Sequence, residues 1–295
     1  MRTAIITDTN SGMLPEDAAE HGIFLLPMPI IIDGREYLEH IDITPDQFYA
    51  RQLEGAEIHT SQPSAGDVID LWEKLLKDYD EVVHIPMSSS LSGSCQSAQL
   101  YARDFGGRVH VVDNQRISVT QRQSALDAKA LADGGASGAE IRRILEETKA
   151  ESHIYIMVDT LKYLKKGGRI TPAAATIAGV LNIKPVLQIQ GGKLDAFAKC
   201  RGVKSAKKTI IRAVTDGVVN EFGGLDAPKP GAWLGFAYTH NHDAAETFLA
   251  EAKEAFPGFD IHADELPMSI ATHVGPGSLA MTCTKVLPGG VQQYA

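Results

Sequence analysis

Hydroxyl and glycine residues gather in three short stretches of this 295-residue chain. They are Thr60–Ser64, Ser88–Ser94 and His273–Gly277, and the second holds five serines. Hydroxyls, the backbone N–H groups at the start of a helix and an imidazole are donors that satisfy a buried carboxylate or oxyanion. Glycines let the backbone turn its amides toward a ligand. The three stretches, which we call the first, second and third loops, therefore predict a site for a small anion.

The first two loops lie beside elements that would position them. β-branched runs at residues 3–7, 81–86 and 108–112 predict short strands, and the second loop follows one of them. Apolar residues recur at helical spacing after Ser64, which is a suitable N-cap for that helix. A capping box from Ser137 to Glu140 begins another helix.

Strands and helices alternate again after residue 153. The pattern predicts strands near 154–158, 185–189, 194–198, 232–238 and 259–263, and helices near 172–181, 203–219 and 243–255. The expected fold class is therefore α/β. We expect two α/β domains, at residues 1–152 and 153–295.

The composition excludes several classes of protein. Lysine and arginine number 28 against 37 acidic residues, a formal net charge of −9, which argues against nucleic-acid binding and adhesion to anionic membranes. The most apolar run, Ile23–Ile32, is far shorter than the roughly 20 residues that a spanning helix needs. Cys95, Cys200 and Cys283 form neither a metal-binding pair nor an even disulfide set. We therefore expect a cytoplasmic protein with no membrane span.

The charge is unevenly distributed. Between Leu161 and Arg212 the chain carries twelve basic residues and one acid, Asp195, so that window is +11 and the remainder is −20. One interpretation is a solvated surface with scattered lysines. The other is a docking surface for an acidic partner or a phosphorylated ligand, because clustered cations attract anions even on an acidic protein.

Taken in order, the motifs resemble the bacterial DegV family. The resemblance includes Asp8-Thr9, the three loops, Leu164–Ile170 and Lys184-Pro185, and it spans nearly the whole chain. It implies two α/β domains, the first with a Rossmann-like parallel sheet and the second with a mixed sheet, and a long-chain fatty acid between them. It also implies that the protein presents this acid to a separate ATP-binding kinase subunit, which makes an acyl phosphate.

The resemblance also assigns roles to residues. The positions implied to bind the ligand are Thr60, Ser61, Ser92, Gly93, Ser94, His273 and Gly275. Thr60 and Ser92 match the hydroxyls that hold the carboxylate. Arg169 and Arg201 match arginines that serve the carboxylate end or kinase docking. Ser94-Cys95 and Gly202 depart from the family pattern. The resemblance therefore does not imply which acyl chains this protein prefers.

The residues agree with a binding role that needs no cofactor and no metal. Each buried methylene of an acyl chain contributes about 0.8 kcal/mol, and only 6% of the residues are aromatic, which suits an aliphatic tunnel. No Gly-x-x-x-x-Gly-Lys-Ser/Thr loop is present, so ATP is expected on another protein.

Two alternatives from other classes stay open. A hydrolase acting on acyl esters would use Ser92 or Cys95 as the nucleophile, with His273 or His84 as the base. A metal enzyme would use His240 and His242, placed at i and i+2 of a strand.

Overall fold

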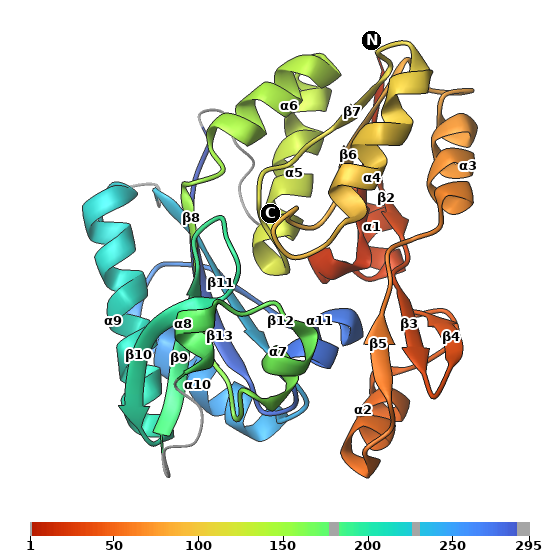
Figure 1. Ribbon diagram of the computed structural model, residues 1–295. Helices are drawn as coiled ribbons and strands as arrows, with labels where there is room; N and C mark the ends of the chain where they lie inside the picture. The colour runs from red at the N-terminus through yellow and green to blue at the C-terminus, as the bar shows by residue number, and fades with distance from the viewer. Residues whose placement is uncertain (1, 177–182, 226–230, 288–295) are drawn as a thin grey trace. The chain divides into compact units, whose positions relative to one another are not determined.

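The computed structural model describes residues 2–176, 183–225 and 231–287, and these divide into two compact units. The first unit contains the chain up to Lys149 together with Pro267–Ser269. The second contains Ala150–Leu266 and the stretch that begins at Ile270. Each unit has its own sheet and core, and each is described separately below (Figure 1).

The first unit is built on a parallel four-stranded sheet. Its strands, in spatial order, are β2 (Ile23–Leu26), β1 (Thr3–Asp8), β6 (Glu81–Ile85) and β7 (Val109–Val111). Every residue of β1 is buried, as expected for a central parallel strand that is covered on both faces. Short 3-10 turns follow β1 at Thr9–Ser11 and precede β7 at Ala102–Phe105.

Helices cover both faces of this sheet (Figure 1). On one face lie α3 (Ala65–Leu75) and α4 (Ser94–Tyr101), which pack around the fully buried Trp72. On the other lie α5 (Val119–Asp133) and α6 (Gly138–Glu147), and the short α1 (Pro15–Glu20) precedes β2. The predicted caps are confirmed, since Ser64 Oγ accepts from Asp67 N at 3.1 Å and Ser137 forms a capping box with Glu140.

A small antiparallel sheet adds to the first unit. Its order is β4 (Arg35–Leu38), β3 (Pro29–Ile32) and β5 (Ile58–Thr60), and α2 (Pro45–Glu54) follows β4. Asp33 and Gly34 join β3 to β4 with φ of 50° and 80°, as a tight hairpin turn requires. Ile23–Ile32 is one apolar run in the sequence, whereas the structure divides it between two sheets. The break lies at the prolines, which cannot donate ladder hydrogen bonds.

The second unit is built on a mixed six-stranded sheet. Its order is β10 (Asp195–Arg201), β9 (Ile183–Ile189), β8 (Ser152–Met157), β13 (Leu279–Lys285), β11 (Ala232–Tyr238) and β12 (Ile261–Glu265). Only β11 and β12 pair in parallel, and every other neighbouring pair is antiparallel. The predicted α/β class, with a parallel first sheet and a mixed second sheet, is confirmed.

Long helices cover the core of the second sheet. They are α9 (Val203–Glu221) and α10 (His242–Ala255), which contribute Ile210, Val214 and Phe248 to the core. The shorter helices are α7 (Lys162–Gly167), α8 (Pro172–Ala175) and α11 (Met268–Val274). The helix predicted at 172–181 is seen as α8, and residues 177–181 lie outside the described part of the chain. Within the described ranges no helix is both long and apolar enough to cross a bilayer.

A buried carboxyl group ties three segments of the first unit together. Glu39 is 1% exposed and accepts hydrogen bonds from Thr9 Oγ1 and from the backbone N of Ser269, the latter at 2.7 Å. Ser269 Oγ also donates to Asn10 Oδ1 at 2.7 Å. Burial, with a smaller contribution from the nearby Asp8, raises the pKa of Glu39 to about 7, although the hydrogen bonds from Thr9 and Ser269 oppose the shift.

This raised pKa predicts that the effect of Glu39→Gln on the free energy of unfolding depends on pH. The folded chain holds the Glu39 proton up to about pH 7, whereas the unfolded chain releases it near pH 4.5, so ionisation destabilises the native protein as the pH rises. The stability of Glu39→Gln relative to the wild type should therefore increase by about 3 kcal/mol between pH 4 and pH 8. Urea unfolding of both proteins across that range measures it, and a constant difference would contradict the assignment.

Candidate functional site

The first unit brings the first and second loops together. The first loop runs from the end of β5 to the N-cap of α3, and the second runs from β6 into α4. Gln62 of the first loop is held against α4, because its Oε1 accepts from Ser97 Oγ at 3.2 Å. The same oxygen would lie 3.3 Å from a Cβ added at Gly93, so a larger residue there would disturb the contact. Gln62 of the first loop and Gly93 of the second are therefore neighbours.

Within the second loop, serines organise the start of α4. Ser92 N and Leu91 N both donate to Ser88 O, at 3.1 and 3.0 Å, and Ser92 Oγ accepts from Ser94 N at 3.2 Å. No side chain of the described residues caps α4, whose N-cap position is Gly93. Ser94 Oγ is buried and has no hydrogen-bond partner in the described structure. An unsatisfied buried hydroxyl at a helix start is suited to an anionic ligand.

Thr60 and Ser61 lie at the end of β5. Thr60 pairs with Ile30 of β3 and is half-buried, whereas Ser61 is exposed and its backbone N donates to Pro29 O at 3.2 Å. Pairing in the small sheet therefore fixes the backbone at the point where the first loop begins. No local pattern in the first loop indicates this support from β3.

A hollow of about 550 Å³ adjoins the first loop. Its walls include Ser61, Gln62 and apolar side chains such as Leu25, Leu38 and Leu71. Its lining residues also include three acids, Glu36, Asp67 and Asp70. These negative charges would repel a carboxylate, so this hollow is a poor place for the charged end of a fatty acid.

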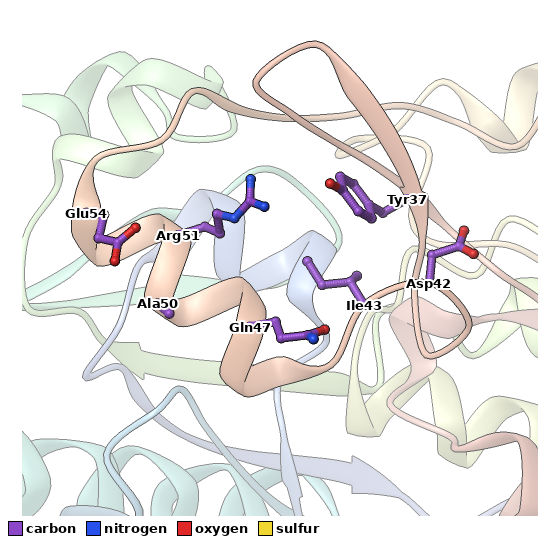
Figure 2. A pocket seen from close by; sticks show the side chains of 7 residues that line it. All are labelled: Tyr37, Asp42, Ile43, Gln47, Ala50, Arg51 and Glu54. Atoms are coloured by element: carbon purple, nitrogen blue, oxygen red, sulfur yellow. The ribbon is translucent and has the colours of Figure 1, made fainter.

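Figure 2 shows a second hollow of the first unit, with a volume of about 360 Å³. It lies between one face of α2 and the segment around β4, and the residues that line it are Tyr37, Asp42, Ile43, Gln47, Ala50, Arg51 and Glu54. None of these residues was predicted to bind a ligand. Asp42 and Glu54 contribute two carboxylates against the single positive charge of Arg51, so this hollow does not favour the binding of an anion.

In the second unit, the third loop packs against the segment that carries α7, and its first two residues, His273 and Val274, are the end of α11 and not part of a loop as expected. A Cβ added at Gly167 would lie only 2.2 Å from His273 Nδ1, and a Cβ at Gly275 would lie 2.3 Å from Tyr163 Cδ2. Gly275 also has a φ of 76°, which favours glycine. Two motifs about 100 residues apart in sequence are therefore neighbours, and both contacts require glycine.

His273 and Arg169 interact electrostatically in this cluster. Burial, with a smaller contribution from the positive charge of Arg169, lowers the pKa of His273 to about 4. Arg169 Nη1 donates to the carbonyl of Gly167. The imidazole is consequently neutral at physiological pH and can donate one hydrogen bond.

Arg201 belongs to a different surface of the second unit. It follows Cys200 at the end of β10 and lines a basic hollow of about 480 Å³ on α9, together with Lys204, Lys208 and Arg212. Arg169 is not among the residues that line this hollow. The resemblance gave Arg169 and Arg201 the same two possible roles, but only Arg201 lines this hollow.

Cys95 and His84 are poorly suited to the hydrolytic chemistry considered above. Burial raises the pKa of the Cys95 thiol to about 12, even though the residue lies in the first turn of α4. Because the thiolate is the nucleophile, this cysteine is unreactive near neutral pH. His84 is buried, its pKa is lowered to about 4, and neither ring nitrogen has a hydrogen-bond partner among the described residues.

The arrangement expected for His240 and His242 is wrong. The strand β11 ends at Tyr238, and Asn241 caps α10 by accepting from Ala244 N at 3.0 Å. His242 begins that helix, and its Nδ1 lies 3.1 Å from Tyr238 Oη. The described ranges contain no group of three or more His, Cys, Asp and Glu side chains placed to hold a metal ion.

Comparison with known proteins shows similarity over nearly the whole chain. A family model described as "Uncharacterised protein, DegV family" matches residues 2–285. A DegV domain-containing protein of Deinococcus radiodurans is 31% identical over 95% of this chain and 98% of its own. Protein DegV of Bacillus subtilis is 29% identical over the same shares.

Solved structures match as well. A DegV family protein of Thermus thermophilus, described as binding fatty acid, is 31% identical, with a TM-score of 0.87 over 97% of this chain and 100% of its own. DegV of Bacillus subtilis, described as a fatty-acid-binding protein, is 27% identical, with a TM-score of 0.83 over the same shares. The chain described here therefore belongs to the DegV family.

Proposed function

We propose that this protein binds a long-chain fatty acid and does no bond-breaking chemistry itself. The single observation that supports the proposal is that Gln62 of the first loop lies close to Gly93 of the second and accepts a hydrogen bond from Ser97 of α4, in the same unit. Membership of a family with fatty-acid-binding relatives supports it. No catalytic residue is proposed.

The carboxylate needs several donors, because a buried charge is costly unless it is satisfied. We assign this role to the hydroxyls of Thr60, Ser92 and Ser94, with the neutral imidazole of His273 as a further donor. The hydroxyl of Ser61 and the backbone N–H groups of Ser61, Gly93 and Gly275 are additional donors to the carboxylate in this proposal. Hydrogen bonds to a charged group contribute about 1.5–3 kcal/mol each, and methylene burial supplies the rest of the affinity.

We further propose that the bound acid is presented to a separate ATP-binding kinase subunit, which forms an acyl phosphate in the cytoplasm. Arg169 is assigned to the charged end of the ligand, because its charge acts on His273 and its guanidinium donates a hydrogen bond to the carbonyl of Gly167. Arg201 is assigned to partner docking, because it lines a separate basic hollow.

Extraction and mass spectrometry test the binding proposal. Protein purified from a bacterial host is expected to release long-chain acids on denaturation, near one acid per chain. Delipidated protein should take up palmitate or oleate in a calorimetric titration. A chain that neither carries an acid nor takes one up would refute the proposal. Ester hydrolysis that is abolished by Ser92→Ala would favour the hydrolase instead.

A further inference from the structure

The hollow of about 550 Å³ beside the first loop has mostly apolar walls. Leu25 of β2, Leu38 of β4 and Leu71 of α3 line it, and all three residues are only half-buried. Hydrocarbon that stays in contact with water is unfavourable, so an aliphatic ligand that covered these leucines would gain free energy. The volume is also within the range of small-molecule sites.

Three acids give this hollow its charge. Glu36 comes from β4, whereas Asp67 and Asp70 stand one turn apart on α3 and so share a face of that helix. All three acids are exposed. The described residues that line the hollow include no lysine, arginine or histidine, so nothing in the lining offsets the negative charge. We call it the acidic hollow.

Two of these acids lack the counter-charges that other acids of the first unit have. Asp133, for example, pairs with Lys129. In the part of the chain that the structure describes, the carboxylates of Glu36 and Asp70 have neither an ion pair nor a hydrogen bond. Asp67 accepts a hydrogen bond from the N-cap hydroxyl of α3 at 2.6 Å, but that neutral donor leaves its charge in place.

The charges are unfavourable where they stand. Asp67 and Asp70 repel each other, because like charges at i and i+3 of a helix are neighbours. Asp67 lies in the first turn of α3, where the helix dipole favours an acid, but Asp70 lies beyond that turn. A ligand that neutralised the acids and covered the leucines would relieve both the repulsion and the exposure of hydrocarbon.

We propose that the acidic hollow binds an aliphatic amine that carries two or more ammonium groups. The alkyl segment covers the leucines, and the ammonium groups pair with Glu36 and with the two acids of α3. A single ammonium group would leave two of the three acids without a counter-charge. Fatty acids, nucleic acids and anionic lipids are all repelled by the same carboxylates. This inference goes beyond fatty-acid binding and does not depend on it.

Calorimetric titration with simple amines tests the acidic hollow. The probes are diaminooctane, diaminobutane, octylamine and octanediol, the diamines and the diol carrying a functional group at each end. They are titrated into the delipidated full chain at about 50 mM NaCl, so that no bound fatty acid can pair with the amine. The variant is Glu36→Gln/Asp70→Asn. The charge-matched control, Glu20→Gln/Glu73→Gln, neutralises two other exposed acids of the first unit, one of them on α3.

Diaminooctane should bind the wild type and the control within about twofold of each other, and the hollow variant about tenfold more weakly. Octylamine lacks the second charge and diaminobutane lacks four methylenes, so each should bind the wild type about threefold or more weakly than diaminooctane. Octanediol should not bind. Equal loss in both variants, or equal affinity for diaminooctane and octanediol, would overturn the proposal. Binding of an oligolysine peptide but of neither diamine would assign the hollow to a protein partner and overturn it as well.

Two further measurements on the same proteins complete the test. Thermal unfolding should show that both variants are folded, because each change neutralises exposed acids only. The samples as purified should all retain fatty acid equally. Loss of the acid from the hollow variant alone would place Glu36 and Asp70 in the fatty-acid site and overturn this proposal. Absence of acid from every sample would contradict the proposed function, whereas the diamine result would stand independently.

Discussion

Ser92→Ala is expected to lower the affinity for a long-chain acid by about 10- to 100-fold. In the proposal its hydroxyl donates to the carboxylate, and one hydrogen bond to a charged group contributes about 1.5–3 kcal/mol. Thr60→Ala should act in the same direction. The loss of affinity in the Thr60→Ala/Ser92→Ala double variant should be smaller than the product of the two single losses, because both hydroxyls would bind the same carboxylate. Calorimetry with delipidated protein measures the affinities.

Ser64→Ala is the matched control in the same part of the fold. Its hydroxyl caps α3 through Asp67 and lies at the far end of the first loop. This variant should lose about 1 kcal/mol of stability and keep its affinity. Wild-type affinity in Ser92→Ala, or equal losses in Ser92→Ala and Ser64→Ala, would remove Ser92 from the site.

Gly167→Ala is expected to displace His273 and to destabilise the second unit. The new methyl group would lie 2.2 Å from His273 Nδ1, so the imidazole must move. Overpacking of this kind costs about 1–3 kcal/mol, and loss of the imidazole donor should weaken acid binding about tenfold or more. Thermal unfolding and calorimetric titration with palmitate measure the two effects.

Gly168→Ala separates movement of His273 from loss of stability. A Cβ at Gly168 would have nothing within 4 Å, but its φ of 68° makes alanine unfavourable by about 1–2 kcal/mol. The two variants should therefore lose comparable stability, and only Gly167→Ala should lose the acid. If both retained the acid equally, His273 would have no part in binding.

The sequence was most informative where a local pattern decides the structure. The caps at Ser64 and Ser137 were predicted correctly, because a capping hydroxyl bonds within three residues of itself. The parallel strands β1 and β6 were recognised because buried strands form continuous β-branched runs. Such features depend on neighbours in sequence, so composition and spacing suffice.

Other features depend on contacts that no local pattern encodes. The division of Ile23–Ile32 between two sheets, the return of Pro267–Ser269 to the first unit and the buried environment of Glu39 were not predicted. The pKa of Glu39 follows from burial among segments that lie up to 230 residues apart. The expected strand position of the histidines around Asn241 was wrong, because Asn241 favours a helix cap there.

The sequence by itself determined the α/β class, the three loops rich in hydroxyls and glycines, and the excess of cations between Leu161 and Arg212. Only the tertiary structure decided which of these features meet. It brought Gln62 of the first loop close to Gly93 of the second, and it packed His273 against Gly167. It also separated Arg169 from the basic hollow on α9 that Arg201 lines. The physical reason is that residue type fixes the donors and charges a chain offers, whereas packing between distant segments fixes which of them are buried, unpaired or adjacent.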